Sequence, residues 1–342
     1  MNTNPLMFVA EISANHLGSF ARAKELVHAA IESGAHAVKF QTYTADTMTL
    51  NLESETFRIS SHHELWGGRK LYDLYQEAHT PWEWHGELFE ICRKSGVIPF
   101  SSPFDFTAVD FLEELNTSMY KIASMESGDI PLISKVASKG KPVIISTGGT
   151  TIEEVREAVA SCRLEGNNQL TLLVCTSSYP SLPKDAHLRR ITKLQEEFGL
   201  AVGVSDHTLG IGVSLAAIGL GATIIEKHFT LNRSDGGADA DFSMEPKEFA
   251  ALVKEGNDAH VSLGSENWGE IESEYESRRL RRSLYIVNDV SSGEIVTDEN
   301  VRAIRPNGGL APKYFENILG KRFNQNLTKG SPLKLEHLDL EI

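Results

Sequence analysis

The chain has 342 residues and a formal net charge of −14, and no apolar run is long enough for a signal peptide or a membrane span. The acidic balance argues against a general nucleic-acid-binding surface, and three cysteines without CxxC spacing argue against a disulfide framework or a zinc finger. We therefore expect a cytoplasmic protein with reduced thiols, built as one barrel of roughly 250 residues plus a small extra domain.

Eight short apolar stretches recur through the first 264 residues, each followed by a polar cluster and a helical pattern. Strands that alternate with helices predict a parallel sheet, and eight such units without a long break predict a closed (β/α)₈ TIM barrel. The predicted strands lie in Phe8–Ser13, His36–Tyr43, Val97–Ser102, Met119–Glu126, Pro142–Gly148, Leu170–Ser177, Ala201–His207 and Ala222–His228.

Local signals mark the helices between these strands. Ser19 is suited to cap a helix that Gly34 ends, and Thr151 with Glu154 has capping-box spacing. One connection, residues 44–79 between the second strand and its helix, is much longer than the others. A long loop on this face of a barrel usually shapes the substrate pocket, and a surface elaboration or a dimer contact is the alternative.

The C-terminal part of the chain differs from the barrel in its sequence pattern. Residues 1–264 are predicted to form the barrel, residues 265–282 a charged linker, and residues 283–342 a small β domain. A weak internal repeat aligns Gly293 with Gly330 and suggests two half-units that interleave. A domain of this size is marginally stable alone and gains stability by packing on the barrel or on a partner subunit.

Ionisable and hydroxyl side chains gather where the predicted strands end, which is where barrel active sites lie. Lys39 and Lys121 in this position indicate a Schiff base or an anion site, and the surrounding hydroxyls favour an anion site. Ion pairing of these lysines with Glu11 or Glu126 is the alternative. The strand-end residues are Glu11, Asn15, His16, Lys39, Gln41, Ser101, Ser102, Lys121, Ser124, Glu126, Ser146, Thr147, Thr176, Ser177, Ser205, Asp206, His207, Glu226 and His228.

His207 and His228 end the seventh and eighth predicted strands, which are neighbours in a barrel. Strand alternation puts Ser205 and His207 on one face, and Glu226 and His228 on one face. Two neutral imidazoles above the barrel mouth form a half-site for a divalent transition metal, completed by water and substrate. Asp206 or Glu226 is suited to orient the rings, and ordinary hydrogen-bonding histidines are the alternative.

In this order, the strand-end residues resemble the sialic acid (nonulosonic acid) synthase family. The resemblance extends over nearly the whole chain. The matching strings are AlaGluIleSerAlaAsnHis (10–16), ValLysPheGlnThr (38–42), SerSerProPhe (101–104), TyrLysIleAlaSerMetGlu (120–126), IleSerThrGly (145–148), CysThrSerSerTyrPro (175–180), SerAspHisThr (205–208), GluLysHisPhe (226–229) and IleArgPro (304–306).

The resemblance implies a barrel followed by an antifreeze-like SAF (β-clip) domain, in a domain-swapped homodimer whose tails cover the partner's barrel mouth. It implies a carbon–carbon bond-forming transferase that condenses phosphoenolpyruvate with an open-chain N-acetylated sugar. The implied cofactor is a divalent metal, Mn²⁺ first, with Mg²⁺ or Co²⁺ as the alternatives.

The resemblance also implies roles for single residues. His207 and His228 would hold the metal, Glu126 would handle the attacking water, and Arg305 would reach across the dimer to the sugar's acyl group. The implied catalytic residues are Glu126, Glu11, Lys121 and Lys39. The implied substrate-binding residues are Gln41, Ser124, Ser146, Thr147, Ser177, Tyr179, Ser205, Asp239 and Arg305. Those implied for phosphoenolpyruvate are Lys121, Ser124, Ser146, Thr147 and Ser205.

Within the family, residues 66–85 are most similar to pseudaminic acid synthases. Ser177 stands where synthases of sialic acid proper carry asparagine, which fits a different sugar. The implied substrate is 2,4-diacetamido-2,4,6-trideoxy-L-altrose, and Trp66, Tyr72 and Tyr75 are candidates to contact it or to pack in the core or dimer. The alternatives are synthesis of N-acetylneuraminate or N,N′-diacetyllegionaminate, a metal-dependent or lysine aldolase that releases no phosphate, and a non-catalytic sugar-binding protein.

Overall fold

The computed structural model describes residues 6–61, 65–266, 268 and 271–339. Parts of the predicted loop 44–79, of the predicted linker 265–282 and of the two chain ends fall in the gaps and lie outside the described residues. The chain divides into two compact units, Met1–Gly264 and Ser265–Ile342, and each is described by itself.

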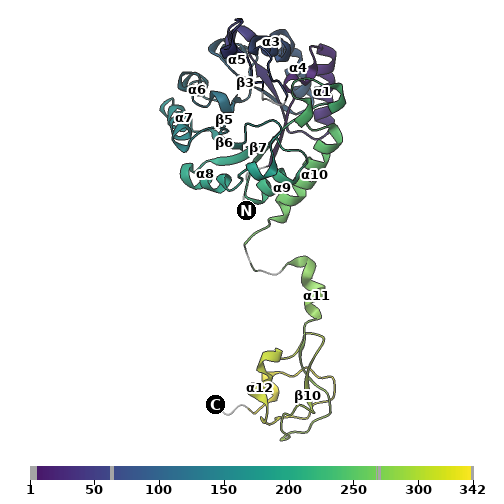
Figure 1. Ribbon diagram of the computed structural model, residues 1–342. Coiled ribbons are helices and arrows are strands. Elements are labelled where there is room, and N and C mark those ends of the chain that lie inside the picture. The colour runs from purple at the N-terminus through teal and green to yellow at the C-terminus, as the bar shows by residue number, and fades with distance from the viewer. Residues whose placement is uncertain (1–5, 62–64, 267, 269–270, 340–342) are drawn as a thin grey trace. The chain divides into compact units, whose positions relative to one another are not determined.

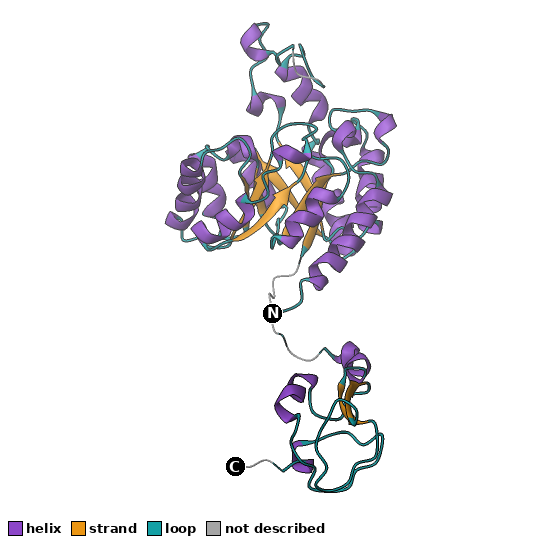
Figure 2. Ribbon diagram, turned by 60° about the horizontal axis from the view of Figure 1, so that its bottom comes forward, coloured by secondary structure: helices purple, strands orange, loops and turns teal. Residues whose placement is uncertain are grey.

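The first unit is a closed barrel of eight parallel strands, as the sequence predicts. Each strand pairs with the next along the chain, and β1 also pairs with β8, which closes the sheet. Helices surround the strands in both views (Figures 1 and 2). The strands are β1 Met7–Glu11, β2 Ala37–Thr42, β3 Ile98–Pro103, β4 Tyr120–Ile122, β5 Val143–Ser146, β6 Leu170–Cys175, β7 Ala201–Ser205 and β8 Ile224–His228.

The helices of the first unit follow the strands in the predicted alternation, and the predicted helix caps are present. The Ser19 side chain accepts a hydrogen bond from the Arg22 backbone, and Thr151 and Glu154 form a reciprocal capping box. The α-helices are α1 Phe20–Glu32, α2 Ala45–Met48, α3 Leu71–Ala78, α4 Trp82–Lys94, α5 Phe106–Glu114, α6 Ile130–Ala137, α7 Ile152–Leu164, α8 Arg190–Phe198, α9 Gly212–Gly219 and α10 Pro246–Ser262.

The fourth strand is shorter than the sequence suggests. The predicted stretch Met119–Glu126 ends as a strand at Ile122, and the chain then turns into the 3₁₀ turn η3, Ser124–Glu126. The Ser127 hydroxyl donates to the Ser124 carbonyl at 2.6 Å and stabilises this turn. The turn carries Ser124 and Glu126 on the loop at the carboxyl end of the barrel, where the strand alternation that holds up to Ile122 no longer applies.

The barrel buries apolar side chains on both faces of its sheet. The outward side chains of the strands, such as Phe8, Val38 and Phe40, pack with the helices in one large core. Inside the barrel, space is so limited that a Cβ atom at Gly203 would lie 2.4 Å from the Ile224 carbonyl oxygen. Glycine is therefore required at this position of β7.

The long loop between β2 and α4 is folded rather than irregular. It contains α2, the 3₁₀ turn η2 (Glu55–Phe57) and α3, and Arg58 pairs with Lys70 in an antiparallel bridge. The indole N–H of Trp66 donates to the Ala238 carbonyl at 3.0 Å, in the loop that follows β8. This hydrogen bond therefore connects the loop after β2 with the loop after β8, the last strand of the barrel.

The second unit has its own apolar core around two antiparallel strands, β9 Ser283–Ile286 and β10 Val301–Ile304. It also contains η7 Glu272–Glu274, α11 Tyr275–Arg279 and α12 Phe315–Ile318. Val290 and Leu327 exchange both backbone hydrogen bonds, at 2.9 and 3.0 Å. These residues lie at equivalent positions of the predicted repeat, so the two half-units pair with each other.

No helix in the described part of the chain combines the length and apolar character needed to cross a bilayer. Cys92, Cys162 and Cys175 are all buried free thiols.

Candidate active site

The inner surface of the barrel changes from apolar to polar at the carboxyl ends of the strands. Side chains alternate along a strand, so residues two positions apart face the same way. The apolar layer inside the barrel contains Val9, Ala37, Phe100, Ile144, Leu173 and Ile224. Two positions later on the same strands lie Glu11, Lys39, Ser102, Ser146, Cys175 and Glu226, all buried. We call this second set the polar layer.

A buried ion triad crosses the polar layer from β1 to β2 and β8. The Lys39 ammonium lies 2.7 Å from Glu11 Oε2 and 3.2 Å from Glu226 Oε1. Burial acts to lower the pKa of Lys39, but the two carboxylates outweigh it and raise this pKa above its usual value. Burial acts to raise the pKa of Glu226, but Lys39 and Lys121 lower it to about 2. The ion-pairing alternative therefore describes Lys39, which stays charged at neutral pH.

Lys121 has a different environment. Its ammonium donates to the Ser146 hydroxyl at 2.6 Å and to the Ile122 carbonyl at 3.2 Å. No carboxylate of the described residues lies within 4.0 Å of it. Burial lowers the pKa of Lys121 to about 8. A buried ammonium that lacks a carboxylate partner and touches a hydroxyl fits an anionic ligand better than a structural ion pair.

Near Lys121, hydroxyl groups meet over the backbone of Gly148, whose N–H donates to Ser124 Oγ at 3.1 Å. A Cβ atom at Gly148 would lie 2.3 Å from Ser177 Oγ and 2.8 Å from Ser124 Oγ, so these residues meet over a bare backbone. The Ser177 hydroxyl is buried without a hydrogen-bond partner among the described residues. An unsatisfied buried hydroxyl is costly unless a ligand completes its hydrogen bonds. Lys121, Ser124, Ser146 and Ser177 together form what we call the anion end of the site.

Glu126 is a carboxyl group with a pKa near neutrality. Burial is the main cause and raises the pKa of Glu126 to about 7. One of its oxygens, Oε2, is buried and has no hydrogen-bond partner in the described part of the chain. A carboxyl group that changes protonation near pH 7 is suited to general acid–base chemistry.

The two predicted metal ligands face each other. The ring centroids of His207 and His228 lie 5.2 Å apart, and both side chains are buried. His207 Nδ1 lies 3.0 Å from the Thr176 carbonyl, to which it donates, so Nε2 carries the lone pair, 3.5 Å from the Ser205 hydroxyl. His228 Nδ1 is buried without a hydrogen-bond partner among the residues described and lies 3.8 Å from Asp239 Oδ2.

The electrostatics keep one imidazole neutral. Burial, reinforced by the neighbouring His207, lowers the pKa of His228 well below its usual value. Burial and the charge of Glu11 raise the pKa of Asp239 to about 6. The described residues contain no group of three or more His, Cys, Asp or Glu side chains placed to hold a metal ion. The described residues thus bring two imidazoles and the Asp239 carboxylate close together, and the metal half-site stays a prediction.

Of the two carboxylates expected to orient the rings, Asp206 contacts neither imidazole, and Glu226 accepts from the Ser205 hydroxyl, which lies 3.5 Å from His207 Nε2. Asp206 accepts hydrogen bonds from Thr208 and Ser214 and pairs with Lys227 at 3.2 Å. These contacts lie on the outward side of the strand, because residues adjacent in a strand face opposite ways. His207 is oriented instead by the Thr176 carbonyl.

A cavity of about 420 Å³ lies above this polar layer. One part of its wall is polar and carries Gln41, Ser124, Glu126, Tyr179, His228 and Asp239. The rest is largely apolar and carries Tyr43, Met48, Ile59, Trp66, Leu71, Leu74, Tyr75 and Phe104. Of the three aromatic candidates in the long loop, Trp66 and Tyr75 line the cavity, whereas the Tyr72 hydroxyl donates to Asp46 at 3.2 Å.

The predicted site residues of the barrel that do not line this cavity are Glu11, Lys39, Lys121, Ser146, Thr147, Ser177, Ser205 and His207. The Thr147 hydroxyl donates to the Leu173 carbonyl at 3.1 Å and is therefore engaged with the backbone. Arg305 follows β10 in the second unit, where it is exposed, and its position relative to the barrel is not defined.

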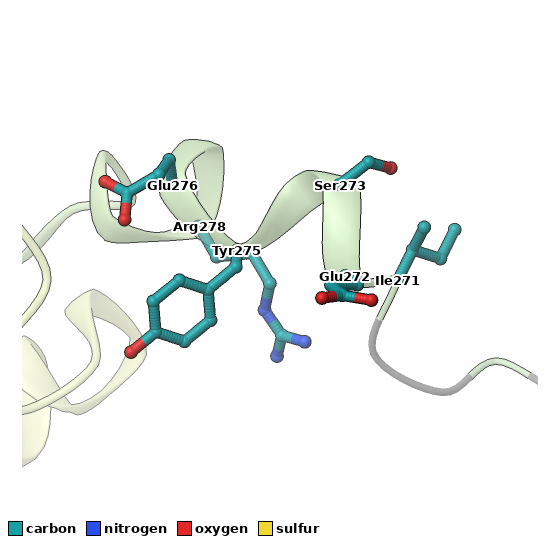
Figure 3. Close-up of a pocket in the computed structure, with 6 residues that line it drawn as sticks. All are labelled: Ile271, Glu272, Ser273, Tyr275, Glu276 and Arg278. Atoms are coloured by element: carbon teal, nitrogen blue, oxygen red, sulfur yellow. The ribbon is translucent and has the colours of Figure 1, made fainter.

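A hollow on the linker, lined by residues such as Glu272, Tyr275 and Arg278, contains no buried side chain and carries no chemistry (Figure 3).

Sequence reasoning overlooked Ser13, Tyr43 and Cys175. Tyr43 follows Gln41 by two positions, so strand alternation alone would have placed it on the same face. Cys175 occupies the polar layer, and its sulfur lies 3.9 Å from His207 Nδ1. Ser13 follows Glu11 by two positions in the predicted strand, but no sequence signal indicated its left-handed backbone conformation.

The fold and the polar layer define a (β/α)₈-barrel protein with a buried polar site at the carboxyl ends of its strands, followed by a separate small β unit. Residues 26–267 match the model of the NeuB family, and residues 281–339 match that of the SAF domain. The chain belongs to the NeuB family.

Relatives match along almost the whole chain. A pseudaminic acid synthase from Helicobacter pylori is 44% identical over 98% of both chains. An N,N′-diacetyllegionaminic acid synthase from Legionella pneumophila is 39% identical over 97% of this chain and 94% of the relative. The solved structure of an N-acetylneuraminic acid synthetase from Leptospira borgpetersenii, in complex with citrate, is 32% identical with a TM-score of 0.71. The match covers 80% of this chain and 90% of that one.

Proposed function

We propose that this protein is a pseudaminic acid synthase, a transferase that condenses phosphoenolpyruvate with 2,4-diacetamido-2,4,6-trideoxy-L-altrose and releases phosphate. The observation that carries the proposal is that the anion end and the two facing imidazoles lie at the same mouth of the barrel. The 44% identity to the Helicobacter pylori enzyme supports this choice of sugar over the alternatives.

A divalent metal, Mn²⁺ first, fits the residues that are present. The buried, unpartnered Nδ1 of His228 and the Nε2 of His207 are two nitrogen donors, and waters and substrate would complete the coordination. The metal would supply Lewis acidity at the sugar aldehyde. The neutral state of His228, favoured by burial, leaves its lone pair free for this role.

Phosphoenolpyruvate fits the anion end. Lys121, Ser124, Ser146 and Ser205 would hold its phosphate and carboxylate, and Ser177 would add a donor at the Gly148 backbone. Its C3 carbon attacks the sugar aldehyde, which forms the new carbon–carbon bond and leaves positive charge at C2. Water adds at C2, and the resulting hemiketal phosphate loses phosphate by cleavage of the C–O bond. Positioning of both reactants can remove on the order of 7–11 kcal/mol from such a barrier.

Glu126 is the group proposed to take the proton of the attacking water. Its pKa of about 7 lets it accept a proton at neutral pH and return it later. Glu11, Lys39 and Gln41 would border the sugar, together with Tyr179 and Asp239. The triad holds Glu11, Lys39 and Glu226 in a fixed geometry, and the lowered pKa of Glu226 keeps that carboxylate ionised.

The cavity wall supports a sugar that is only partly polar. A 2,4-diacetamido-2,4,6-trideoxy sugar carries two acetamido methyls and a third methyl at C6. Such a ligand needs apolar contact as well as hydrogen bonds, and the wall around Tyr43, Trp66 and Tyr75 offers it. A site fitted to a second acetamido group discriminates strongly against a hydroxyl in its place.

We propose a domain-swapped homodimer in the cytoplasm, with residues 1–264 as catalytic domain, 265–282 as linker and 283–342 as SAF domain. Exposed apolar side chains on the segments that follow the carboxyl ends of the strands support a cover of this kind, with Met125 69% exposed. We call this set the apolar rim. It consists of Leu17, Leu50, Leu52, Phe106, Met125, Leu182 and Leu209.

The test is a phosphate-release assay with phosphoenolpyruvate and a panel of acetamido sugars, with Mn²⁺ or with chelator, and with products identified by mass. We expect rapid phosphate release with the L-altro diacetamido sugar and none after chelation. Equal activity on N-acetylmannosamine would overturn the choice of sugar. Product formation without phosphate release would point to an aldolase instead.

A further inference from the structure

Ser13 adopts a backbone conformation that favours glycine. Its φ is +29°, in the left-handed region, where a Cβ atom is crowded by the backbone. Ser13 lies two positions after the last residue of β1 and begins the 3₁₀ turn η1, Ser13–His16. A side chain that persists in a strained conformation at the edge of a site indicates that the side chain has a function there.

The hydroxyl of Ser13 joins two residues of the site. It donates to Glu11 Oε1 and accepts from Gln41 Nε2 at 2.9 Å. The Ser13 backbone N–H donates to the same Glu11 oxygen at 2.9 Å. The side chain is 2% exposed, so water does not compete for these bonds.

The positive φ and these hydrogen bonds belong together. The left-handed turn folds the residue back so that its N–H and its hydroxyl both reach the carboxylate two positions earlier. The other oxygen of Glu11 is held by Lys39 at 2.7 Å. Glu11 is thus fixed from both sides, and Gln41, which lines the cavity, is fixed to the same group.

We propose that Ser13 is a positioning residue that fixes Glu11 and Gln41 at the sugar end of the site. The inference rests on the proposed function, since it is stated for the sugar of that reaction. Ser13 itself touches neither the anion end nor the imidazoles in the contacts described, so its effect should fall on the sugar and spare phosphoenolpyruvate.

The variant Ser13→Gly separates the contribution of the hydroxyl to activity from its contribution to the stability of the fold. Glycine adopts the left-handed conformation freely, so the variant should unfold at the parent temperature or above. Loss of the shared hydroxyl should lower kcat/KM for the sugar on the order of tenfold, through a lower kcat and a higher sugar KM. The KM for phosphoenolpyruvate should stay at the parent value. Ser13→Ala, which keeps the strained Cβ, should lose the same activity.

Asn116→Gly is the matched control. Asn116 also has a positive φ, +53°, but it is exposed and follows α5, at the end of the barrel away from the cavity. Relief of strain there should leave all kinetic constants unchanged. This control separates a local effect of the Ser13 hydroxyl from a general effect of backbone relaxation.

The outcomes are distinct. Parental kinetics in Ser13→Gly, or loss in Ser13→Ala alone, would overturn the role of the hydroxyl. Equal rises in both KM values, or a lowered unfolding temperature that accounts for the loss, would also overturn it. A parent protein that forms no product from any sugar would instead overturn the proposed function, and the role of Ser13 with it.

Discussion

Glu126 is the residue whose environment gives the clearest prediction about the pH dependence of activity. Burial raises its pKa from 4.5 to about 7. A base must be deprotonated to act, so kcat/KM should rise with pH and level off above a midpoint near pH 7. Glu126→Gln should remove this dependence and lower kcat by about 10²- to 10⁴-fold. The pH–rate profiles of both proteins test this, and an unchanged acid limb in the variant would contradict it.

The same group affects stability with a defined sign. Its folded-state pKa is raised, so the folded protein binds this proton more tightly than the unfolded chain does. The stabilisation is complete below pH 4.5 and is lost as the pH rises through about 7. Between these values, Glu126→Gln should therefore become progressively more stable relative to the parent, as measured by denaturant unfolding.

His207 and His228 give a second prediction at this scale. Replacement of either by alanine removes one of the two imidazole nitrogens that the described residues are proposed to offer the metal, so turnover should fall below detection. The fold should persist, because neither ring is part of the large apolar core. Circular dichroism and thermal unfolding serve as the control. Near-parental rates of both variants in excess Mn²⁺ would contradict the metal assignment.

At the scale of elements, the loop between β2 and α4 is the feature that shapes the cavity. Trp66 fastens it to the Ala238 carbonyl, and its ring lies 6.0 Å from that of Tyr179. Trp66→Phe keeps a ring but loses the hydrogen bond, and should raise the sugar KM about three- to tenfold. Trp66→Ala should raise it further, and neither should change the KM for phosphoenolpyruvate.

Tyr72→Phe is the matched control in the same loop. The Tyr72 hydroxyl contacts Asp46 outside the cavity wall, so its loss should leave both KM values unchanged. If Trp66→Phe behaves as Tyr72→Phe does, the loop does not contribute to sugar binding through this contact.

The elements also show what the sequence could predict. Alternation and capping signals gave the strands, the helices and the face on which Ser205, Glu226 and His228 lie, because these depend on local periods of the chain. Closure of the barrel brings Lys39 to Glu226, 187 positions later, and Trp66 to Ala238, 172 positions later. Such pairings depend on the tertiary fold, and no local pattern contains them. The 3₁₀ turn that begins at Ser124 is also absent from the sequence prediction, which extends the fourth strand through this bend.

At the scale of the whole molecule, we propose that Arg305 of the second unit contributes to the active site of a partner subunit. If the tail acts across subunits, Arg305→Ala and His207→Ala are each inactive, but a mixed dimer contains one intact site. Random mixing makes about half of the dimers mixed, so activity should return to about a quarter of the parent value. The measurement is phosphate release after co-refolding or co-expression, with mixed dimers isolated by two affinity tags. Isolated mixed dimers without activity would place the site within one chain.

The most direct test of the central claim follows the bridging oxygen of phosphoenolpyruvate. The anion end and the facing imidazoles are proposed to join this substrate to the diacetamido sugar and to break the C–O bond. With ¹⁸O in the bridging position, mass spectrometry should find the label in the released phosphate, together with an unlabelled nonulosonate of the expected mass. Label retained in the sugar product, or no condensation product at all, would contradict the account.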